Sequence, residues 1–288
     1  MKIPASLRDL MDEGVIDEVL NQLQSGKEAT VYVIRSGGER RCAKVYKSVE
    51  KRNFKSASMY QEGRRLRGSR DSRAAGRRSR HGRKVQEIAW KSAEADALSA
   101  LAQAQVRVPR SYGLFDGVLI MELICDAEGY PAPRLSEVEI EPDLAKQWHD
   151  FMLRQIVRML CAGLVHGDLS EYNILVDAEG PVIIDLPQAV QVAGNNNAFA
   201  LLARDVINMR SAFSRVVPSL AQTRYAEEIW QLYTQGELHP DSPLTGHFQE
   251  EQHSPDIQAV LDEIEDAQLE HEARERGRRE AEADELGD

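Results

Sequence analysis

A polar loop followed by two short aliphatic runs constrains this chain more than any other feature. In the stretch LVHGDLSEYNILV, Asp168 and Asn173 stand just before the first aliphatic run. The second run is Val182–Ile184, and Asp185 follows it directly. The turn-forming residues DAEG separate the two runs. The sequence therefore predicts a β-hairpin with polar side chains at its open end.

Pairing the two runs across this turn places Asn173 opposite Ile184, so Asn173 and Asp185 should emerge at the same end of the hairpin. Two oxygen donors at one point suit Mg²⁺, which keeps several waters and takes further ligands from nucleotide phosphates. A separate carboxylate such as Asp168 can accept a proton from an attacking hydroxyl. We therefore expect Asn173 and Asp185 to bind metal and Asp168 to act as a catalytic base. His166 is expected to hold this loop through hydrogen bonds.

The N-terminal half offers groups that could bind the phosphates of a nucleotide. Lys44 lies in the alternating strand CAKVY, so its side chain should point to the opposite face from its neighbours. Glu94, in the predicted helix 84–103, is its expected partner. The stretch SGKEATVY, which begins at Ser25, could cover phosphates with backbone N–H groups, although it has neither Walker A spacing nor the three-glycine kinase pattern.

The order of predicted elements indicates an α+β protein with a β-rich N-lobe and a mainly helical C-lobe that contains the hairpin. Residues 6–24 have mostly helical spacing, interrupted by Gly14, and a hairpin with strands near Val31–Val33 and Cys42–Tyr46 follows. A further tight hairpin is predicted at Asp116–Gly117, and helices at 144–162 and from 198 to about 235. The expected parts are an N-terminal helical segment, residues 1–24; an N-lobe, residues 25–122; a C-lobe, residues 123–240; and an acidic tail, residues 241–288.

Charge is concentrated in two segments of the chain. Residues 63–84 hold nine Arg and one Lys against one Asp, and residues 249–288 hold fifteen acidic residues against four Arg. The basic segment, here Arg64–Arg83, predicts either a solvated loop or contact with nucleic acid or the ribosome. It lacks the interleaved aromatic residues of a stacking platform for single-stranded nucleic acid.

The first residues, MKIPASLRDLMDEG, lack the apolar core of a secretory leader, and no run of 18 apolar residues occurs. The three widely spaced cysteines are expected to be reduced core residues. The sequence therefore predicts a cytoplasmic protein without membrane contact.

Several of these stretches together resemble the RIO family of atypical serine/threonine protein kinases. They are SGKEATVY, the Lys of CAKVYKS, WKSAEADAL, GYPAPRL, LVHGDLSEYNIL and VIIDLPQAV, and they span about Ser25 to Arg215. No Asp-Phe-Gly or Ala-Pro-Glu motif occurs. The short N-terminal segment leaves no room for the winged-helix module of one RIO subfamily, so the resemblance is to the other subfamily or to a bacterial relative.

The resemblance implies a trimmed two-lobed kinase fold that uses ATP and Mg²⁺, with Mn²⁺ as an alternative, to phosphorylate proteins, including itself. It implies nucleotide-handling roles for Ser25, Lys27, Lys44 and Glu94, and adenine binding by the hinge backbone around Glu122 and Ile124. The resemblance also implies that Asp168 is the proton acceptor and that Asn173 and Asp185 are the metal ligands. In this family the metal-binding Asp, here Asp185, is also a proposed nucleophile that forms an aspartyl phosphate, which would give ATPase activity.

Two other function classes fit parts of the sequence. Small-molecule phosphotransferases of the aminoglycoside or choline kinase type also carry His-Gly-Asp and a later Ile-Asp, but they usually add a larger helical substrate lobe than the residues after Ala198 allow. An RNA-binding scaffold with an ATPase switch would use the basic segment. The complete set of catalytic residues favours the protein kinase.

Overall fold

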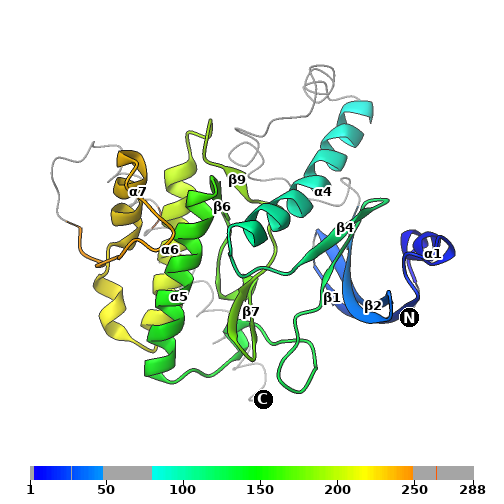
Figure 1. Ribbon diagram of the computed structural model, residues 1–288, viewed down its shortest axis with the longest axis horizontal. Helices are drawn as coiled ribbons and strands as arrows, with labels where there is room; N and C mark the ends of the chain where they lie inside the picture. Colours follow the sequence, from blue (N-terminus) through cyan, green and yellow to red (C-terminus); the bar gives the residue numbers. More distant parts are fainter. Residues whose placement is uncertain (1–2, 27, 48–79, 249–263, 265–288) are drawn as a thin grey trace, which may run out of the picture.

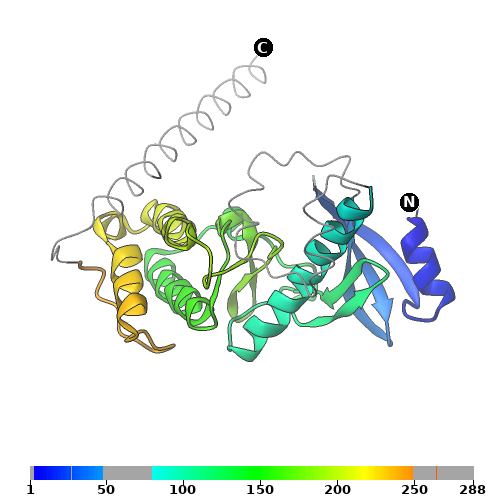
Figure 2. The ribbon, with the colours of Figure 1, turned by 90° about the horizontal axis from the view of Figure 1, so that it is seen from above.

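The computed structural model describes residues 3–26, 28–47, 80–248 and 264, and the side chains of helix α4 from Ser92 onward. Two lobes lie side by side, with helix α4 between the N-terminal sheet and the C-terminal helices (Figures 1 and 2). The principal elements are α1 (Ala5–Asp12), β1 (Glu18–Ser25), β2 (Ala29–Ser36), β3 (Glu39–Tyr46), α4 (Arg80–Gln103), β4 (Ser111–Phe115), β5 (Val118–Glu122), η2 (Leu135–Glu137), α5 (Pro142–Cys161), β6 (Leu164–Val165), η3 (Glu171–Asn173), β7 (Ile174–Asp177), β8 (Gly180–Ile183), β9 (Val190–Gln191), α6 (Ala198–Ser214), η4 (Pro218–Gln222) and α7 (Tyr225–Gln235).

The N-lobe is built on a five-stranded antiparallel sheet with the order β1-β2-β3-β5-β4. The predicted hairpins of this lobe are confirmed as β2–β3 and β4–β5. The helix predicted for residues 6–24 is wrong in its second half, because α1 ends at Asp12 and residues 18–25 form the edge strand β1. Ser25 therefore ends a strand, and its loop joins two strands rather than a helix and a strand.

The two faces of the sheet are covered by different parts of the chain. Leu7 and Leu10 of α1 pack with Ile34, Ala43 and other apolar residues on one face. The other face contributes to a core shared with α4 and the C-lobe, which includes side chains from β3, β5, α4, α5 and α6. This shared core ties the lobes together and leaves the residues at their junction to form the site.

The C-lobe combines helices α5, α6 and α7 with the predicted hairpin β7–β8. The register is as expected, because Ile174 pairs with Ile183 and Val176 pairs with Pro181. The amide of Ile184 donates to the carbonyl of Asn173 at 3.0 Å, which extends the pairing to the open end. Asn173 and Asp185 thus leave the hairpin together.

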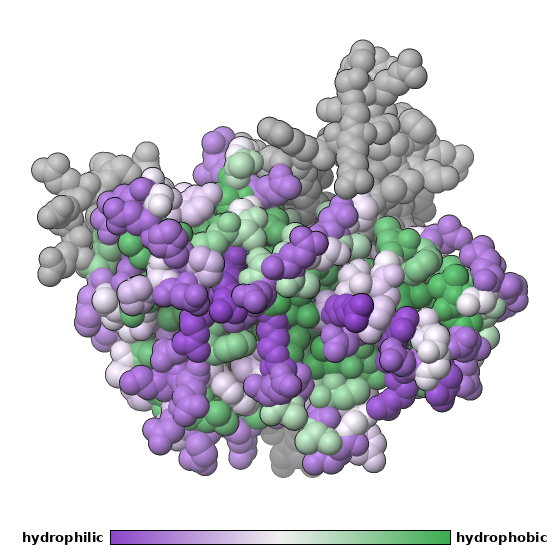
Figure 3. Space-filling model, in the orientation of Figure 1, coloured by the Kyte–Doolittle hydropathy of each residue, from purple (hydrophilic) through white to green (hydrophobic). Residues whose placement is uncertain are grey.

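The surface bears on two expectations about the chain. Cys42 is buried and Cys125 partly buried, but Cys161 is exposed, so the prediction of three core cysteines is wrong for Cys161. On the face in Figure 3, apolar residues gather near the middle of the molecule and hydrophilic residues surround them. Among the helices that the structure describes, none combines the length and the apolar character needed to cross a membrane. Of the basic segment Arg64–Arg83, the structure describes only the backbone of the last four residues, which begin α4, so the prediction for this segment is not tested. Most of the acidic tail also lies outside the described residues.

Candidate active site

Lys44 joins the two lobes through two ion pairs. Its Nζ lies 2.6 Å from Oε1 of Glu94 on α4 and 2.5 Å from Oδ1 of Asp185, just after β8. Its neighbours Ala43 and Val45 pack toward α1 on the opposite face of the sheet, as the alternation of β3 predicts. The predicted pair Lys44–Glu94 is confirmed, and the pair with Asp185 brings the N-lobe to the hairpin of the C-lobe.

Glu94 is held by both of its carboxylate oxygens. The hydroxyl of Tyr46 donates to Oε2 at 2.6 Å, while Lys44 donates to Oε1. Glu94 is 1% exposed, so these two donors replace the water that the carboxylate loses on burial. Sequence reasoning missed Tyr46, although it stands two residues after Lys44 and therefore on the same face of β3.

The charges at this junction stabilise one another. Burial would lower the pKa of Lys44, but the nearby carboxylates of Glu94 and Asp185 outweigh it, and the pKa is raised. Burial would raise the pKa of Asp185, but Lys44 lowers it, with a smaller contribution from Arg134. Lys44 is therefore cationic and Asp185 anionic at neutral pH, which is the state that phosphate and metal binding require.

His166 connects, through backbone hydrogen bonds, the two segments that carry the candidate catalytic carboxylates. Nε2 lies 3.1 Å from the carbonyl of Ile184, which precedes Asp185, and Nδ1 accepts from the amide of Asp168 at 3.2 Å. Burial lowers the pKa of His166, which keeps the ring neutral with its proton on Nε2. The structural role expected for His166 is confirmed by these two hydrogen bonds. Gly167 has a φ of 80°, a conformation that glycine adopts without strain.

Asp168 lies at the same junction and is partly shielded from water. The pKa of Asp168 is raised, because burial, with a smaller contribution from the charge of Asp185, outweighs the lowering by Arg204. Nε2 of Gln188 donates to Oδ2 of Asp168 at 3.3 Å. Gln188 was not among the predicted site residues, but the geometry shows that it orients the expected base.

Helix α6 anchors the loop that carries Asp168. The carboxylate of Asp205 accepts from the amides of Gly167 at 2.8 Å and Leu169 at 2.9 Å, and Nδ2 of Asn208 donates to the carbonyl of Leu169 at 2.7 Å. Sequence reasoning missed both residues. The available signal was a charged residue inside the apolar run of α6, three positions before an Asn on the same helix face.

Burial raises the pKa of Asp205 to about 7, although its two backbone N–H donors act in the opposite direction. A raised folded-state pKa contributes stability that is present below the unfolded pKa and is lost as pH rises through the folded pKa. We expect the stability of the wild type relative to an Asp205→Asn variant to fall between about pH 4 and pH 7, by up to about 4 kcal/mol.

Urea unfolding of both proteins over this pH range checks the expectation, because titrations common to both cancel in the difference. A difference in unfolding free energy that does not change with pH would show that Asp205 does not titrate in this range.

Asn173 and Asp185 have the character of a metal site for a nucleotide. Nδ2 of Asn173 donates to the carbonyl of Asp168 at 2.8 Å, so Oδ1 is the side-chain atom that would bind a cation. The side chain of Asp185 is 45% exposed although Lys44 holds one of its oxygens. No cluster of three His, Cys, Asp or Glu residues suited to a metal occurs within the described residues. The carboxylate of Asp185 and the amide oxygen of Asn173 are hard oxygen donors that fit Mg²⁺, which uses few protein oxygens beside phosphate and water.

The backbone of Asp185 supports a functional role. Its φ of 67° lies in the left-handed region, where few residues other than glycine are found. Such a conformation persists only where surrounding contacts fix it, and it concentrates at functional sites. Here the contacts are the Lys44 ion pair and the hydrogen bond between His166 and the carbonyl of Ile184.

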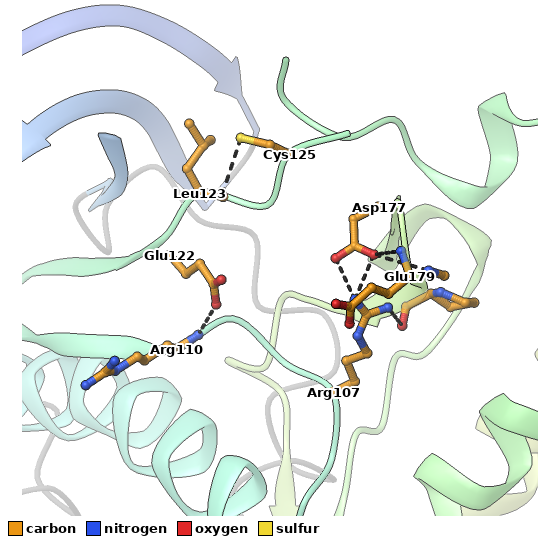
Figure 4. A network of polar contacts seen from close by, with 9 residues as sticks. Arg107, Arg110, Glu122, Leu123, Cys125, Asp177 and Glu179 are labelled. Carbon is orange, nitrogen blue, oxygen red and sulfur yellow. Dashed lines mark hydrogen bonds and ion pairs between the residues drawn. The ribbon is translucent and has the colours of Figure 1, made fainter. Parts of the chain in front are cut away.

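The expected hinge follows β5. The carboxylate of Glu122 accepts from the amide of Arg110 (Figure 4). The same figure shows, in another part of the view, Arg107 bound to the carboxylate of Asp177. The carbonyl of Ile124 accepts from the amide of Ala132 at 3.0 Å. Ile124 is buried, so an adenine edge at its amide would be shielded from water. Adenine binding at Glu122 and Ile124 stays a prediction.

The loop from Ser25 forms a tight turn between β1 and β2. The amide of Gly26 donates to the carbonyl of Ala29 at 2.9 Å, and Nζ of Lys47 lies 3.2 Å from Oγ of Ser25. Ser25 is exposed at the end of β1, as a phosphate-covering residue must be. The role of Ser25 stays a prediction, and Lys27 lies outside the described residues.

Comparisons with known proteins agree with this geometry. The RIO domain profile matches residues 30–226. The RIO-type serine/threonine-protein kinase Rio1 of Haloferax volcanii is 36% identical over 214 residues, which are 73% of this chain and 68% of the relative. The Rio1 of Methanocaldococcus jannaschii is 33% identical over 69% of this chain and 64% of its own, and human serine/threonine-protein kinase RIO1 is 31% identical over 72% and 35%. The chain thus spans from about a third to two thirds of these relatives.

A solved structure shows the same fold. The crystal structure described as the Rio2 kinase–ADP/Mg²⁺–phosphoaspartate complex from Chaetomium thermophilum superposes with a TM-score of 0.55 at 19% identity, over 92% of this chain and 75% of that chain. The predicted two-lobed kinase fold, with a sheet in the N-lobe and helices in the C-lobe, is therefore confirmed. The family profile and the archaeal relatives show that this chain belongs to the RIO family of serine/threonine protein kinases.

Proposed function

We propose that the protein transfers the γ-phosphoryl group of MgATP to serine or threonine hydroxyls of proteins, including its own. The observation that carries the proposal is the contact of Lys44 with both Glu94 and Asp185, beside the His166-linked Asp168. The Lys44 cation of the N-lobe contacts the Asp185 carboxylate of the C-lobe, and Asp168 lies near enough for the charge of Asp185 to raise its pKa. This is the arrangement that phosphoryl transfer requires.

The residues of this chain divide the work. Lys44 neutralises phosphate charge and is kept in place by Glu94 and Tyr46. Asn173 and Asp185 would hold the metal, and Asp168 orients the attacking hydroxyl and accepts its proton. When bound, MgATP supplies the phosphoryl group, and its metal offsets the charge on the phosphate oxygens. The protein supplies position and charge, which account for most of the catalysis in this reaction class.

A route through an aspartyl phosphate is part of the proposal. The Chaetomium Rio2 structure is described as a phosphoaspartate complex with ADP and Mg²⁺. In this chain the exposed, anionic Asp185 would attack the γ-phosphorus, with ADP as leaving group. Transfer of the phosphoryl group from Asp185 to water gives ATPase activity, and transfer to a hydroxyl gives kinase activity.

Three further expectations belong to the proposal. Mn²⁺ can replace Mg²⁺, because oxygen ligands accept both ions. The basic segment Arg64–Arg83 contacts nucleic acid or the ribosome, since its charge would release counterions from a phosphate backbone. The protein acts in the cytoplasm.

Labelling with γ-labelled ATP tests the activity and the route together. The wild type should yield acid-stable serine or threonine phosphates, and an Asp185→Asn variant should lose nearly all label, because it loses the metal ligand and the nucleophile. An Asp143→Asn variant, which alters an exposed residue of α5, is the matched control and should label as the wild type.

Mass-spectrometric mapping and acid stability separate the products. Acid-labile label on Asp185 of the wild type would demonstrate the aspartyl phosphate. Full labelling of the Asp185→Asn variant would contradict the assignment of Asp185.

A further inference from the structure

Arg134 occupies a position between the two lobes that the reaction scheme above leaves unexplained. Its Nη2 donates to Oε1 of Gln24 at 2.7 Å. Gln24 is the residue before Ser25, where the expected phosphate-covering loop begins. Arg134 itself belongs to the segment that leads from the hinge to η2 in the C-lobe. Its side chain therefore spans from the C-lobe to the edge of the phosphate loop.

The backbone of Arg134 is fixed against the hairpin that carries Asn173. Arg134 forms an antiparallel bridge with Leu175 of β7, and the amide of Val176 donates to the carbonyl of Pro133 at 2.9 Å. Its own amide donates to Oε2 of Glu137 at 2.9 Å. These contacts fix the backbone of Arg134, so no backbone entropy need be lost when its guanidinium binds a ligand.

The charge of Arg134 acts on the site. It adds to Lys44 in lowering the pKa of Asp185, against the effect of burial. The neutral amide of Gln24 does not compensate the guanidinium charge, and it takes one of five N–H donors. Within the described part of the chain, this is the one hydrogen bond that the guanidinium makes. If Arg134 only connected the two lobes, its side chain would need no charge. A residue that binds phosphate needs both the charge and the remaining N–H donors.

We propose that Arg134 is a ligand of the nucleotide polyphosphate, held at the mouth of the site by Gln24 and by its backbone contacts with β7. Its guanidinium supplies a second cation, across the site from Lys44, to the phosphate oxygens. This inference rests on the proposed function, since it assumes that ATP binds between the lobes. It adds to that function a residue that discriminates nucleotides by their phosphates.

Calorimetric titration of MgATP and of adenosine tests the proposal. An Arg134→Gln variant should bind ATP at least about tenfold more weakly, the loss expected for one charge-assisted hydrogen bond, and should bind adenosine within about twofold of the wild type. The ATP loss should shrink at high salt, because the contact is between charges.

A second variant and a control complete the test, with thermal unfolding to confirm folding. Gln24→Ala removes the hydrogen bond that holds Arg134 but keeps the cation, so it should weaken ATP binding by less than Arg134→Gln does and leave adenosine binding as in the wild type. Arg35→Gln removes an exposed arginine of β2 that pairs with Glu18, and it should bind both ligands as the wild type does.

The outcomes separate this inference from the function on which it rests. Equal losses for ATP and adenosine, or no loss for either, would overturn the role of Arg134 while leaving an ATP site in place. A wild-type chain that binds adenosine and ATP equally, or neither, would overturn the proposed function and this inference with it.

Discussion

An Asp168→Asn variant is expected to transfer phosphoryl groups about 10²- to 10⁴-fold more slowly than the wild type, the usual contribution of a positioned general base. The amide cannot accept the proton of the attacking hydroxyl. The fold should persist, because hydrogen bonds to the main chain of Asp168 hold the loop. The amide of Asp168 donates to His166, and the carbonyl of Asp168 accepts from Asn173. Single-turnover labelling with γ-labelled ATP, beside ATP titration, measures both effects.

ATP affinity should change by no more than a few-fold, since in the proposed reaction Asp168 acts on the attacking hydroxyl rather than on the nucleotide. Asp96→Asn, at an exposed position of α4, is the matched control and should keep the wild-type rate. A variant at Asp168 that retains more than half of the rate, or that loses ATP binding in parallel with rate, would show that Asp168 is not the base.

A Lys44→Met variant is expected to lose both activity and stability. Methionine cannot neutralise phosphate, and it leaves Glu94 buried without its cation. Breaking a buried ion pair from one side costs about 3–5 kcal/mol, and the free energy of unfolding in urea should fall by about that amount. Tyr46 still donates to Glu94, so the effect should lie at the lower end of this range.

A second substitution separates stability from catalysis. The double variant Lys44→Met/Glu94→Gln removes the uncompensated charge and should recover most of the lost stability, because a neutral amide is less costly to bury. Phosphoryl transfer should remain as low as in the single variant. Recovery of activity in the double variant would show that Lys44 serves only to neutralise Glu94.

The hairpin, and the position of Asn173 and Asp185 at its open end, could be predicted because they depend on local pairing. The turn DAEG sets the register of β7 and β8, and the register alone places Asn173 near Asp185. Lys44 and Glu94 required a second step, in which a strand lysine is matched with a helix glutamate fifty residues away. That step relied on the chemistry of phosphate binding rather than on a sequence pattern.

Strand β1 was misread as helix for a physical reason. Its pairing with β2 shifts register between Val19 and Asn21 and again between Gln22 and Gln24, so the usual alternation of buried and exposed residues is broken. The spacing of Val19, Leu20 and Leu23 then resembles a helix face. Residues 18–25 form a strand rather than a helix because they pair with β2, and the local sequence pattern does not contain that information.

The anchors of the catalytic loop could not be found from local sequence. Asp205 and Asn208 meet Gly167 and Leu169 across more than thirty residues, through backbone atoms that carry no sequence signal. Arg134 likewise meets Gln24 across 110 residues. Such contacts depend on how α6 and the hinge segment are placed by the shared core, which only the folded chain reveals.

The central claim is that Lys44 and Glu94 of the N-lobe and Asp168, Asn173 and Asp185 of the C-lobe serve one nucleotide. A crystal structure of the protein with Mn²⁺ and a non-hydrolysable ATP analogue, using anomalous scattering to locate the metal, tests it most directly. We predict the metal between Asn173 and Asp185, phosphate oxygens at Lys44, and the terminal phosphate facing Asp168. A nucleotide bound outside the junction of the lobes, or a metal away from Asn173 and Asp185, would contradict the account.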